Sequence, residues 1–406
     1  MIPRRAVLAL GLSQLISWGV TYYLIGVFGE EIAADLGWSR DLVYGGFAAC
    51  LLAMGLMSPL AGRIVDRHGG GRIMAAGALF NAAGLAGVAA SHGVALYYAS
   101  FVVMGVGMRL TLYDAAFAAL ARIGGPQARG PMAQITLLGG LASTVFWPLG
   151  HWLSQDLGWR GATLAFAGAA LLTIPLCLTL PDRVYDGAPR AGAKTPLRGQ
   201  ALQGREFALA GFLYAIIAAG ANFLNAGMSA EMIAVLTGLG LGVSLAVSVS
   251  TLRGVGQSLA RLSEILFGGG MDPLALNLLA CVLMPFAFVA GGFAGASVIA
   301  SGAFAFLYGA CNGVLTITRG TVPLVLFDPL RYGALMGALI APSFIVSAAA
   351  PLAYALVIDR FGANGALALS FAVALAQLAA AAALKVRFSH REATSDKIAP
   401  TGRRAP

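Results

Sequence analysis

Long apolar runs alternate with short polar or Gly/Pro-containing interruptions along most of the chain. A helix needs about 20 apolar residues to cross the hydrocarbon core of a bilayer, and most of the runs have about this length. They lie near residues 7–28, 41–62, 73–90, 95–120, 131–153, 161–180, 207–230, 240–260, 273–292, 298–325, 332–357 and 364–384. The pattern predicts an all-α membrane protein with twelve transmembrane helices.

A polar interval divides these runs into two groups of six. It carries five basic residues among prolines and glycines: Arg183, Arg190, Lys194, Arg198 and Arg205. We interpret 181–206 as a flexible cytoplasmic linker between an N-terminal six-helix bundle (1–180) and a C-terminal one (207–385). The polar segment 386–406 is expected to be a disordered cytoplasmic tail.

The overall composition agrees with a membrane protein. Hydrophobic residues make up 59% of the 406 residues, charged residues only 11%, and the mean hydropathy is +0.82. About a quarter of the residues of an ordinary soluble domain are charged. A soluble enzyme or a disordered chain is therefore excluded.

The net charge of +9 is best explained by membrane topology. If the N-terminus is cytoplasmic, the Lys and Arg residues fall in cytoplasmic segments with six exceptions: Arg40, Arg160 and Arg360 outside, and Arg109, Arg253 and Arg319 within spans. Basic residues concentrate on the cytoplasmic side of membrane proteins. We expect a multi-pass protein of the plasma membrane, the bacterial inner membrane, with both termini cytoplasmic and no nucleic-acid partner.

The two halves also resemble each other. The segment LAGRIVD at residues 60–66 parallels LARLSE at residues 259–264, with an arginine followed by an acid three residues later. The segment from Pro148 to Gly158 parallels the segment from Pro351 to Gly362. Internal repeats of this kind are typical of transporters, whose substrate site lies at the interface of the repeats near the bilayer midplane.

One loop motif identifies a family resemblance. Residues 62–72 read GRIVDRHGGGR, which resembles the G-x-x-x-D-R-x-G-x-R loop of the major facilitator superfamily with one additional residue before the last arginine. The resemblance covers roughly residues 7–385. It implies two pseudo-symmetric six-helix bundles that rock around a central site, as a secondary transporter does in symport or antiport. The implied gating residues are Gly62, Arg63, Asp66, Arg67, Arg72, Arg261 and Glu264.

A second resemblance concerns the branch within the superfamily. The G-W-S-R element at residues 37–40 is similar to that of the monocarboxylate porters and oxalate/formate exchangers. Those porters carry a substrate-binding arginine at the position of Arg253, so the resemblance implies that Arg253 holds a substrate carboxylate with two parallel hydrogen bonds. The chain departs from that branch at Val249, where the porters have an aspartate, and in the first span, which lacks their lysine.

Charged residues within the spans point to the same kind of substrate. Arg109 and Asp114 lie in the fourth span, Arg253 in the eighth and Arg319 in the tenth. An ionisable group at membrane depth is costly and faces a cavity or a partner. Three cations against one anion favour a small organic anion.

Each of these residues has a candidate role and a structural alternative. Arg253 is the first candidate for the substrate carboxylate, with Arg109 in support. Asp114 is the candidate proton site, and we expect it to form a charge pair with Arg319 that changes between the inward and outward states. Its simpler alternative role is only to neutralise Arg109 or Arg319. Four polar residues of the first and seventh spans either line the cavity or hydrogen-bond between helices: Tyr22, Tyr23, Asn222 and Asn225.

Enzyme motifs do not occur in this sequence. ATP hydrolysis would need a Gly-Lys pair and a zinc protease a His-Glu pair, and the chain has neither. We therefore predict a transporter without cofactor or metal that acts as a monomer in the lipid bilayer. Its expected partners are a small anionic molecule and, as a candidate coupling ion, the proton. The alternatives are an exporter of drug-like or lipophilic compounds and a membrane sensor or assembly factor.

Overall fold

The computed structural model describes residues 2–185, 202, 204–267 and 271–388. The larger part of the predicted linker and residues 389–406 of the predicted tail lie outside these ranges. The described chain is helical, and its longer helices are α1 (Arg4–Ser17), α2 (Leu24–Leu36), α3 (Arg40–His68), α4 (Gly70–Ala89), α5 (Val94–Thr111), α6 (Tyr113–Gly124), α7 (Arg129–Gly140), α8 (Ala142–Leu178), α9 (Gly204–Gly238), α10 (Val243–Phe267), α11 (Pro273–Gly292), α12 (Val298–Leu326) and α13 (Tyr332–Phe388). A π-helix, Trp18–Tyr22, joins α1 to α2.

These helices provide the predicted twelve crossings. Eight helical stretches within the described ranges are long and apolar enough to span a bilayer by length and composition. Val94–Leu178 is one stretch of 85 residues that holds three crossings, which are divided by the turn Gly125–Ala128 and by a bend at Gly158. α13 bends at Gly362 and holds two crossings. α10 has three charged residues among its 25 and provides the twelfth crossing. A backbone φ near +65° at both bends suits glycine, which has no Cβ to clash.

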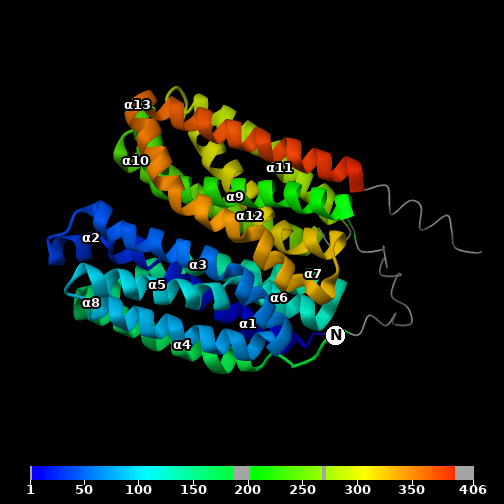
Figure 1. The fold of residues 1–406 in the computed structure, drawn as a ribbon. Coiled ribbons are helices and arrows are strands. Elements are labelled where there is room, and N and C mark those ends of the chain that lie inside the picture. The colour runs from blue at the N-terminus through cyan, green and yellow to red at the C-terminus, as the bar shows by residue number, and fades with distance from the viewer. Residues whose placement is uncertain (1, 186–201, 203, 268–270, 389–406) are drawn as a thin grey trace, which may run out of the picture.

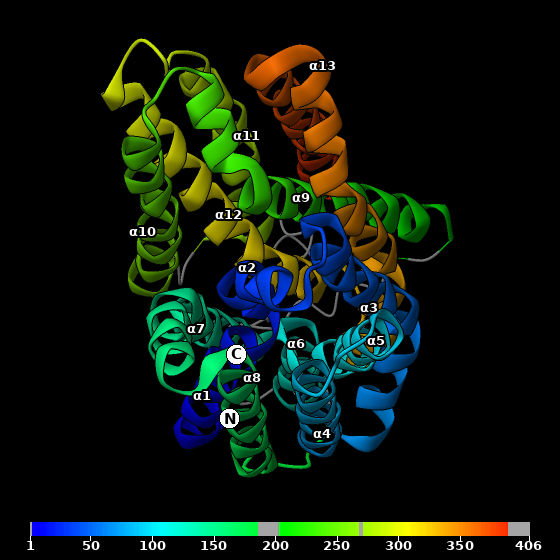
Figure 2. The ribbon, with the colours of Figure 1, turned by 90° about the vertical axis from the view of Figure 1, so that its left-hand side faces the viewer.

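The helices form two bundles that lie side by side. α1 to α8 make up the lower bundle in Figure 1 and α9 to α13 the upper one. Arg4 at the start of α1 and Phe388 at the end of α13 lie at the same end of the molecule, which we call the terminal end, and the other is the distal end. Looking along the bundles, Figure 2 places α7 beside α10 and α3 beside α13, so each half contacts the other along two lines.

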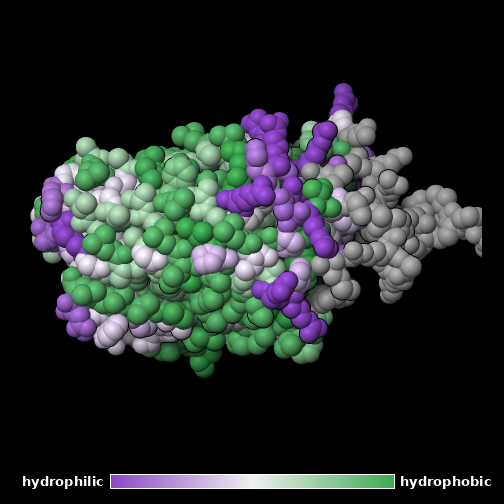
Figure 3. Space-filling view, turned by 90° about the horizontal axis from the view of Figure 1, so that it is seen from below, coloured by the Kyte–Doolittle hydropathy of each residue, from purple (hydrophilic) through white to green (hydrophobic). Residues whose placement is uncertain are grey.

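The lateral surface of the molecule is apolar. Figure 3 shows a broad hydrophobic band between polar ends, with more polar side chains at the terminal end. Large apolar side chains such as Leu56, Leu172 and Phe212 are exposed on single helices. Because helices satisfy their own backbone hydrogen bonds, such a surface is stable in hydrocarbon.

The first line of contact between the halves depends on a close approach of α3 to α13. A Cβ on Gly62 would overlap the carbonyl oxygen of Gly333, so the two backbones touch there. One turn later, the Asp66 carboxylate accepts hydrogen bonds from the backbone N–H groups of Gly333 at 3.0 Å and Ala334 at 2.7 Å. An anion at a helix N-terminus satisfies free N–H groups and interacts favourably with the helix dipole.

The arginines of the predicted gating loop do not hold Asp66 directly. Arg63 donates to the carbonyl oxygen of Pro59, Arg72 lies 3.8 Å from Asp182, and Arg67 is exposed. Arg122 of α6 instead donates to the backbone oxygen of Asp66. The acid of this motif therefore links the two halves, while its basic residues stay within the N-terminal half.

The second line of contact joins α7 to α10. Arg261 donates to the carbonyl oxygen of Thr136 at 3.0 Å, and Glu264 lies 3.6 Å from Arg129. Glu264 is the counterpart of Asp66 in the sequence repeat. Each half thus provides one acid that binds the other half at the terminal end, and the bundles separate toward the distal end in Figure 1.

We predict that Gly62→Ala weakens closure of the terminal end. The added methyl must displace the backbone of α13, and overpacking of this kind costs about 1–3 kcal/mol. Thr136 is buried in the closed form, so a cysteine placed there by Thr136→Cys reports on opening. In purified protein, this cysteine should react with a maleimide at least about tenfold faster with Gly62→Ala than without it.

The matched control is Gly168→Ala, because a Cβ at Gly168 meets open space. The four native cysteines are buried and give a low background. Equal labelling rates in the two variants would contradict a requirement for the close approach at Gly62.

Candidate substrate site

The fourth span is discontinuous at the depth of its charged residues. Arg109 lies in the last turn of α5 and Asp114 in the first turn of α6, and Leu112 between them has an extended backbone. Asp114 therefore sits at a helix N-terminus, where a carboxylate is favoured. Broken helices at mid-depth are typical of substrate and ion sites in transporters.

Asp114 is paired with Arg319 of the opposite half. The Arg319 Nη2 atom lies 3.1 Å from Asp114 Oδ1, and both side chains are largely buried. Arg319 Nη1 donates to Asn222 Oδ1 at 2.9 Å, while its Nε has no partner among the described residues. Of the two arginines considered as counterions of Asp114, the expected partner, Arg319, is the one that forms an ion pair with it.

Arg109 contacts residues other than those that surround Arg253. Its Nε donates to Ser58 Oγ at 2.8 Å, and its guanidinium lies 6.0 Å from the ring of Phe344. It is 3% exposed and interacts electrostatically with Asp114 and Arg319. Arg109 thus belongs to the charge cluster around Asp114, and its joint binding of a carboxylate with Arg253 stays a prediction.

Arg253 is surrounded by neutral groups. Its Nη2 donates to Asn225 Oδ1 at 2.7 Å and to Ser229 Oγ at 2.8 Å, and the guanidinium lies 5.3 Å from the ring of Tyr308. Asn312 donates to the same oxygen of Asn225 at 2.9 Å. Among the described residues, no carboxylate forms an ion pair with Arg253, so its charge is uncompensated.

The two asparagines of α9 divide between the two arginines. Asn222 accepts from Arg319 and donates to Ser343 Oγ at 2.8 Å, whereas Asn225 accepts from Arg253. Residues three apart share one face of a helix. α9 therefore presents two polar positions on one face, one for the Arg319 ion pair and one for the uncompensated arginine.

The tyrosines of the first span lie at and beside the π-helix. Tyr22 is the last residue of the π-helix and Tyr23 follows it, and their ring centroids are 5.6 Å apart. The Tyr22 side chain interacts electrostatically with both Arg253 and Arg319 of the opposite half. Tyr22 therefore lies near enough to the opposite half to be influenced by both arginines.

The charges in this part of the interior sum to a positive value. Among the described residues in the middle of the spans, Arg109, Arg253 and Arg319 are accompanied by one carboxylate, that of Asp114, which leaves two positive charges. Uncompensated cations at this depth favour an anion and repel cations.

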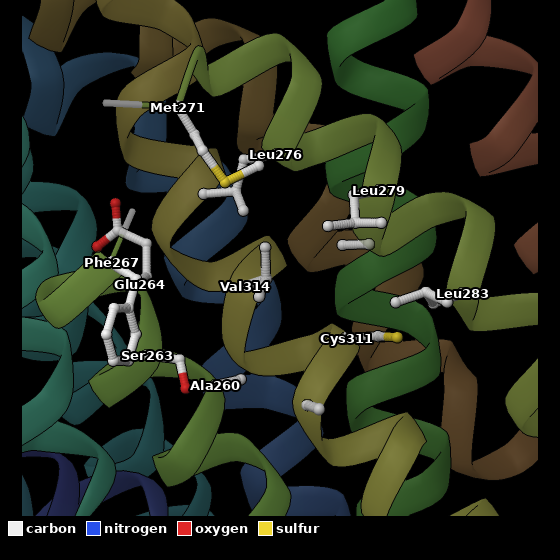
Figure 4. Close-up of a pocket in the computed structure, with 12 residues that line it drawn as sticks. Ala260, Ser263, Glu264, Phe267, Met271, Leu276, Leu279, Leu283, Cys311 and Val314 are labelled. Atoms are coloured by element: carbon white, nitrogen blue, oxygen red, sulfur yellow. The ribbon is translucent and has the colours of Figure 1, made fainter. Parts of the chain in front are cut away.

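A cavity of about 320 Å³ lies between α10, α11 and α12, apart from the charged residues described above. Figure 4 shows its lining of apolar side chains, including Leu276, Leu279 and Val314, with the Glu264 carboxylate at one side. Leu279 and Leu283 are exposed, which places its opening on the lateral surface. This cavity is apolar and separate from the arginines.

Five residues of the site were not predicted from the sequence: Ser58, Ser229, Tyr308, Ser343 and Tyr214, whose hydroxyl donates to the backbone oxygen of Arg319 at 2.7 Å. They are common residue types in membrane helices, and only the fold brings them to the charges. Tyr308 had one detectable feature, since it lies four residues before Asn312 and so shares a helix face with it. The break at Leu112 also had no signal, because neither Gly nor Pro marks it.

Several solved structures share this fold. The human organic anion transporter MFSD10 (TETRAN) matches with a TM-score of 0.72 and 19% identity over 93% of this chain and 99% of that one. The proton:xylose symporter XylE, bound to 6-bromo-6-deoxy-D-glucose, matches with a TM-score of 0.73 and 13% identity over 95% of each chain. A double Trp mutant of XylE matches with a TM-score of 0.71 and 14% identity over 93% of this chain and 94% of that one.

The sequence itself gives the family. No curated protein matches the chain. The family described as Major Facilitator Superfamily matches residues 10–351, which is most of the chain and extends over parts of both bundles. The chain therefore belongs to the major facilitator superfamily of transporters.

Proposed function

We propose that this chain is a secondary active transporter of a small organic anion, a carboxylate, and that it works by alternating access with proton coupling. The observation that carries the proposal is the uncompensated charge of Arg253 among neutral partners. A guanidinium binds a carboxylate through two parallel, charge-assisted hydrogen bonds. The carboxylate would neutralise a charge that the protein leaves without a counterion.

The fold alone does not select the substrate. One structural neighbour is an organic anion transporter and another a proton:xylose symporter, so this architecture accommodates both kinds of cargo. Function depends on the side chains of the site. Here these are cationic at Arg253 and hydrogen-bonding at Asn225, Ser229 and Asn312.

The arrangement of the halves supports alternating access. Contacts through Asp66 and Glu264 close the terminal end, and the bundles separate toward the distal end. With the termini in the cytoplasm, as the charge distribution predicts, this arrangement opens toward the outside. Rocking of the halves would then expose Arg253 to either side in turn.

Asp114 supports the proton coupling. Its carboxylate forms an ion pair with Arg319 in the interior, and a proton bound there would remove the negative charge that holds this pair. The pair joins α6 of one half to α12 of the other. Protonation of Asp114 would release Arg319 and alter the contact between the halves at mid-depth.

Transport of lipophilic compounds is the second candidate function. The apolar cavity between α10, α11 and α12 favours it, because its opening on the lateral surface would admit a molecule from the bilayer. This function would not need Arg253. Substitution of that residue therefore discriminates between the two.

The first prediction concerns Arg253→Gln in proteoliposomes. Uptake of labelled carboxylates should fall by about 10- to 100-fold, since hydrogen bonds to a charged group contribute about 1.5–3 kcal/mol each. Arg253→Lys keeps the charge without the planar pair of donors and should give an intermediate loss.

A suitable control is Arg387→Gln, which removes one positive charge from an exposed pair with Glu206. Exposed pairs contribute little, and uptake should be unchanged. Transport of a lipophilic cation that is indifferent to Arg253→Gln would instead favour the second candidate function.

The second prediction concerns Asp114→Asn. This variant should lose accumulation driven by a pH gradient and keep exchange of substrate across the membrane, because the proton acceptor is removed while Arg253 remains. Two assays on the same vesicles, gradient-driven uptake and counterflow, measure the two activities.

Loss of one partner from a buried pair costs about 3–5 kcal/mol of stability, so the double variant Asp114→Asn with Arg319→Gln provides a charge-balanced control. It should fold and also lack gradient-driven uptake. Full gradient-driven accumulation by either variant would show that the coupling proton binds elsewhere.

A further inference from the structure

A cluster of aromatic side chains occupies the N-terminal half opposite Arg253. The π-helix turns Trp18 and Tyr22 so that their ring centroids lie 4.8 Å apart. Trp18 also lies 4.9 Å from Tyr113, and Tyr22 lies 5.1 Å from Phe47 in an edge-on arrangement. Short π-helical segments occur frequently at functional sites.

This cluster contains a hydrogen-bond donor without an acceptor. The indole Nε1 of Trp18 is buried and has no partner among the described residues. Indole is a donor only, and a buried polar group normally has a partner. The unpaired N–H therefore fits a ligand that brings an acceptor into the aromatic cluster.

The cluster and the cation belong to different halves of the molecule. Trp18, Tyr22 and Phe47 lie in the N-terminal bundle, and Arg253 lies on α10 of the other. Tyr22 interacts electrostatically with Arg253 and with Tyr308, whose ring lies beside that arginine. A ligand between them would contact an aromatic surface on one half and a guanidinium on the other.

We propose that the substrate is an aryl carboxylate. Its carboxylate would bind Arg253, its ring would pack against Trp18, Tyr22 and Phe47, and an acceptor on the ring would take the hydrogen bond of Trp18 Nε1. The proposal rests on the proposed function, because it assumes the anion site at Arg253. It assigns the aromatic cluster as the element that determines specificity.

The physical reason for selectivity lies in bridging the halves. A short aliphatic carboxylate would bind Arg253 without touching the aromatic cluster, and so would not favour the state in which the halves approach. A ligand shifts a conformational equilibrium only by its difference in affinity for the two states. An aryl group, which packs favourably in offset or edge-on geometry, provides that difference.

The test is uptake of labelled phenylacetate and labelled propanoate into proteoliposomes of the full chain. The unsubstituted protein should take up phenylacetate at least about tenfold more efficiently in kcat/KM. Phe47→Leu should reduce the phenylacetate value several-fold more than the propanoate value. Trp18→Phe should remove the preference for 4-methoxyphenylacetate, which carries an acceptor, over phenylacetate.

Phe207→Leu is the matched control, because Phe207 makes a similar edge-on pair with Phe327 at 5.5 Å, away from Arg253. Its uptake of both acids should be unchanged. Arg253→Gln should abolish uptake of both acids.

The outcomes separate the two proposals. The aryl specificity would be overturned, and the anion transporter kept, if propanoate uptake depends on Arg253 and one of two further results is found. These results are no preference for phenylacetate, or an equal effect of Phe47→Leu on both acids. Failure of both acids to be taken up, or uptake indifferent to Arg253→Gln, would overturn both. If Phe47→Leu folds poorly, competition of propanoate uptake by phenylacetate in the unsubstituted protein decides the question.

Discussion

The buried ion pair between Asp114 and Arg319 is the interaction on which the arrangement of the interior depends. It joins the two halves at mid-depth, and each of its members is also held within its own half. In a low-dielectric interior an unpaired charge is costly, so the pair forms wherever the halves permit it. Because Asp114 neutralises Arg319, the charge of Arg253 has no counterion among the described residues.

The sequence was sufficient to predict the architecture. Apolar runs of spanning length, the GRIVDRHGGGR motif and the repeated Arg-acid spacing predicted a twelve-helix protein of the superfamily, and the fold and the family match confirm this. These signals are local: span length is set by the thickness of hydrocarbon, and the motif lies within eleven residues. Charged residues within spans were identifiable for the same reason, since they interrupt an apolar background.

The contacts within the site were harder to predict from the sequence. Arg109 and Arg253 are alike in sequence, yet one is held by Ser58 and Phe344 and the other by Asn225 and Ser229. Which polar side chain meets which charge depends on helix rotation and on contacts between residues far apart in the chain. Neither the break at Leu112 nor the π-helix at residues 18–22 is marked by proline, so periodicity alone predicts straight helices there.

The reciprocal placement of Asp66 and Glu264 constrains how the terminal end can open. Figure 2 places the α3–α13 contact and the α7–α10 contact on opposite sides of the bundle. If the halves tilt about one of these contacts, that contact serves as the hinge and the other breaks. A partial opening would therefore be asymmetric. Symmetric opening of the terminal end would require both acids to detach, so we expect the two contacts to break cooperatively.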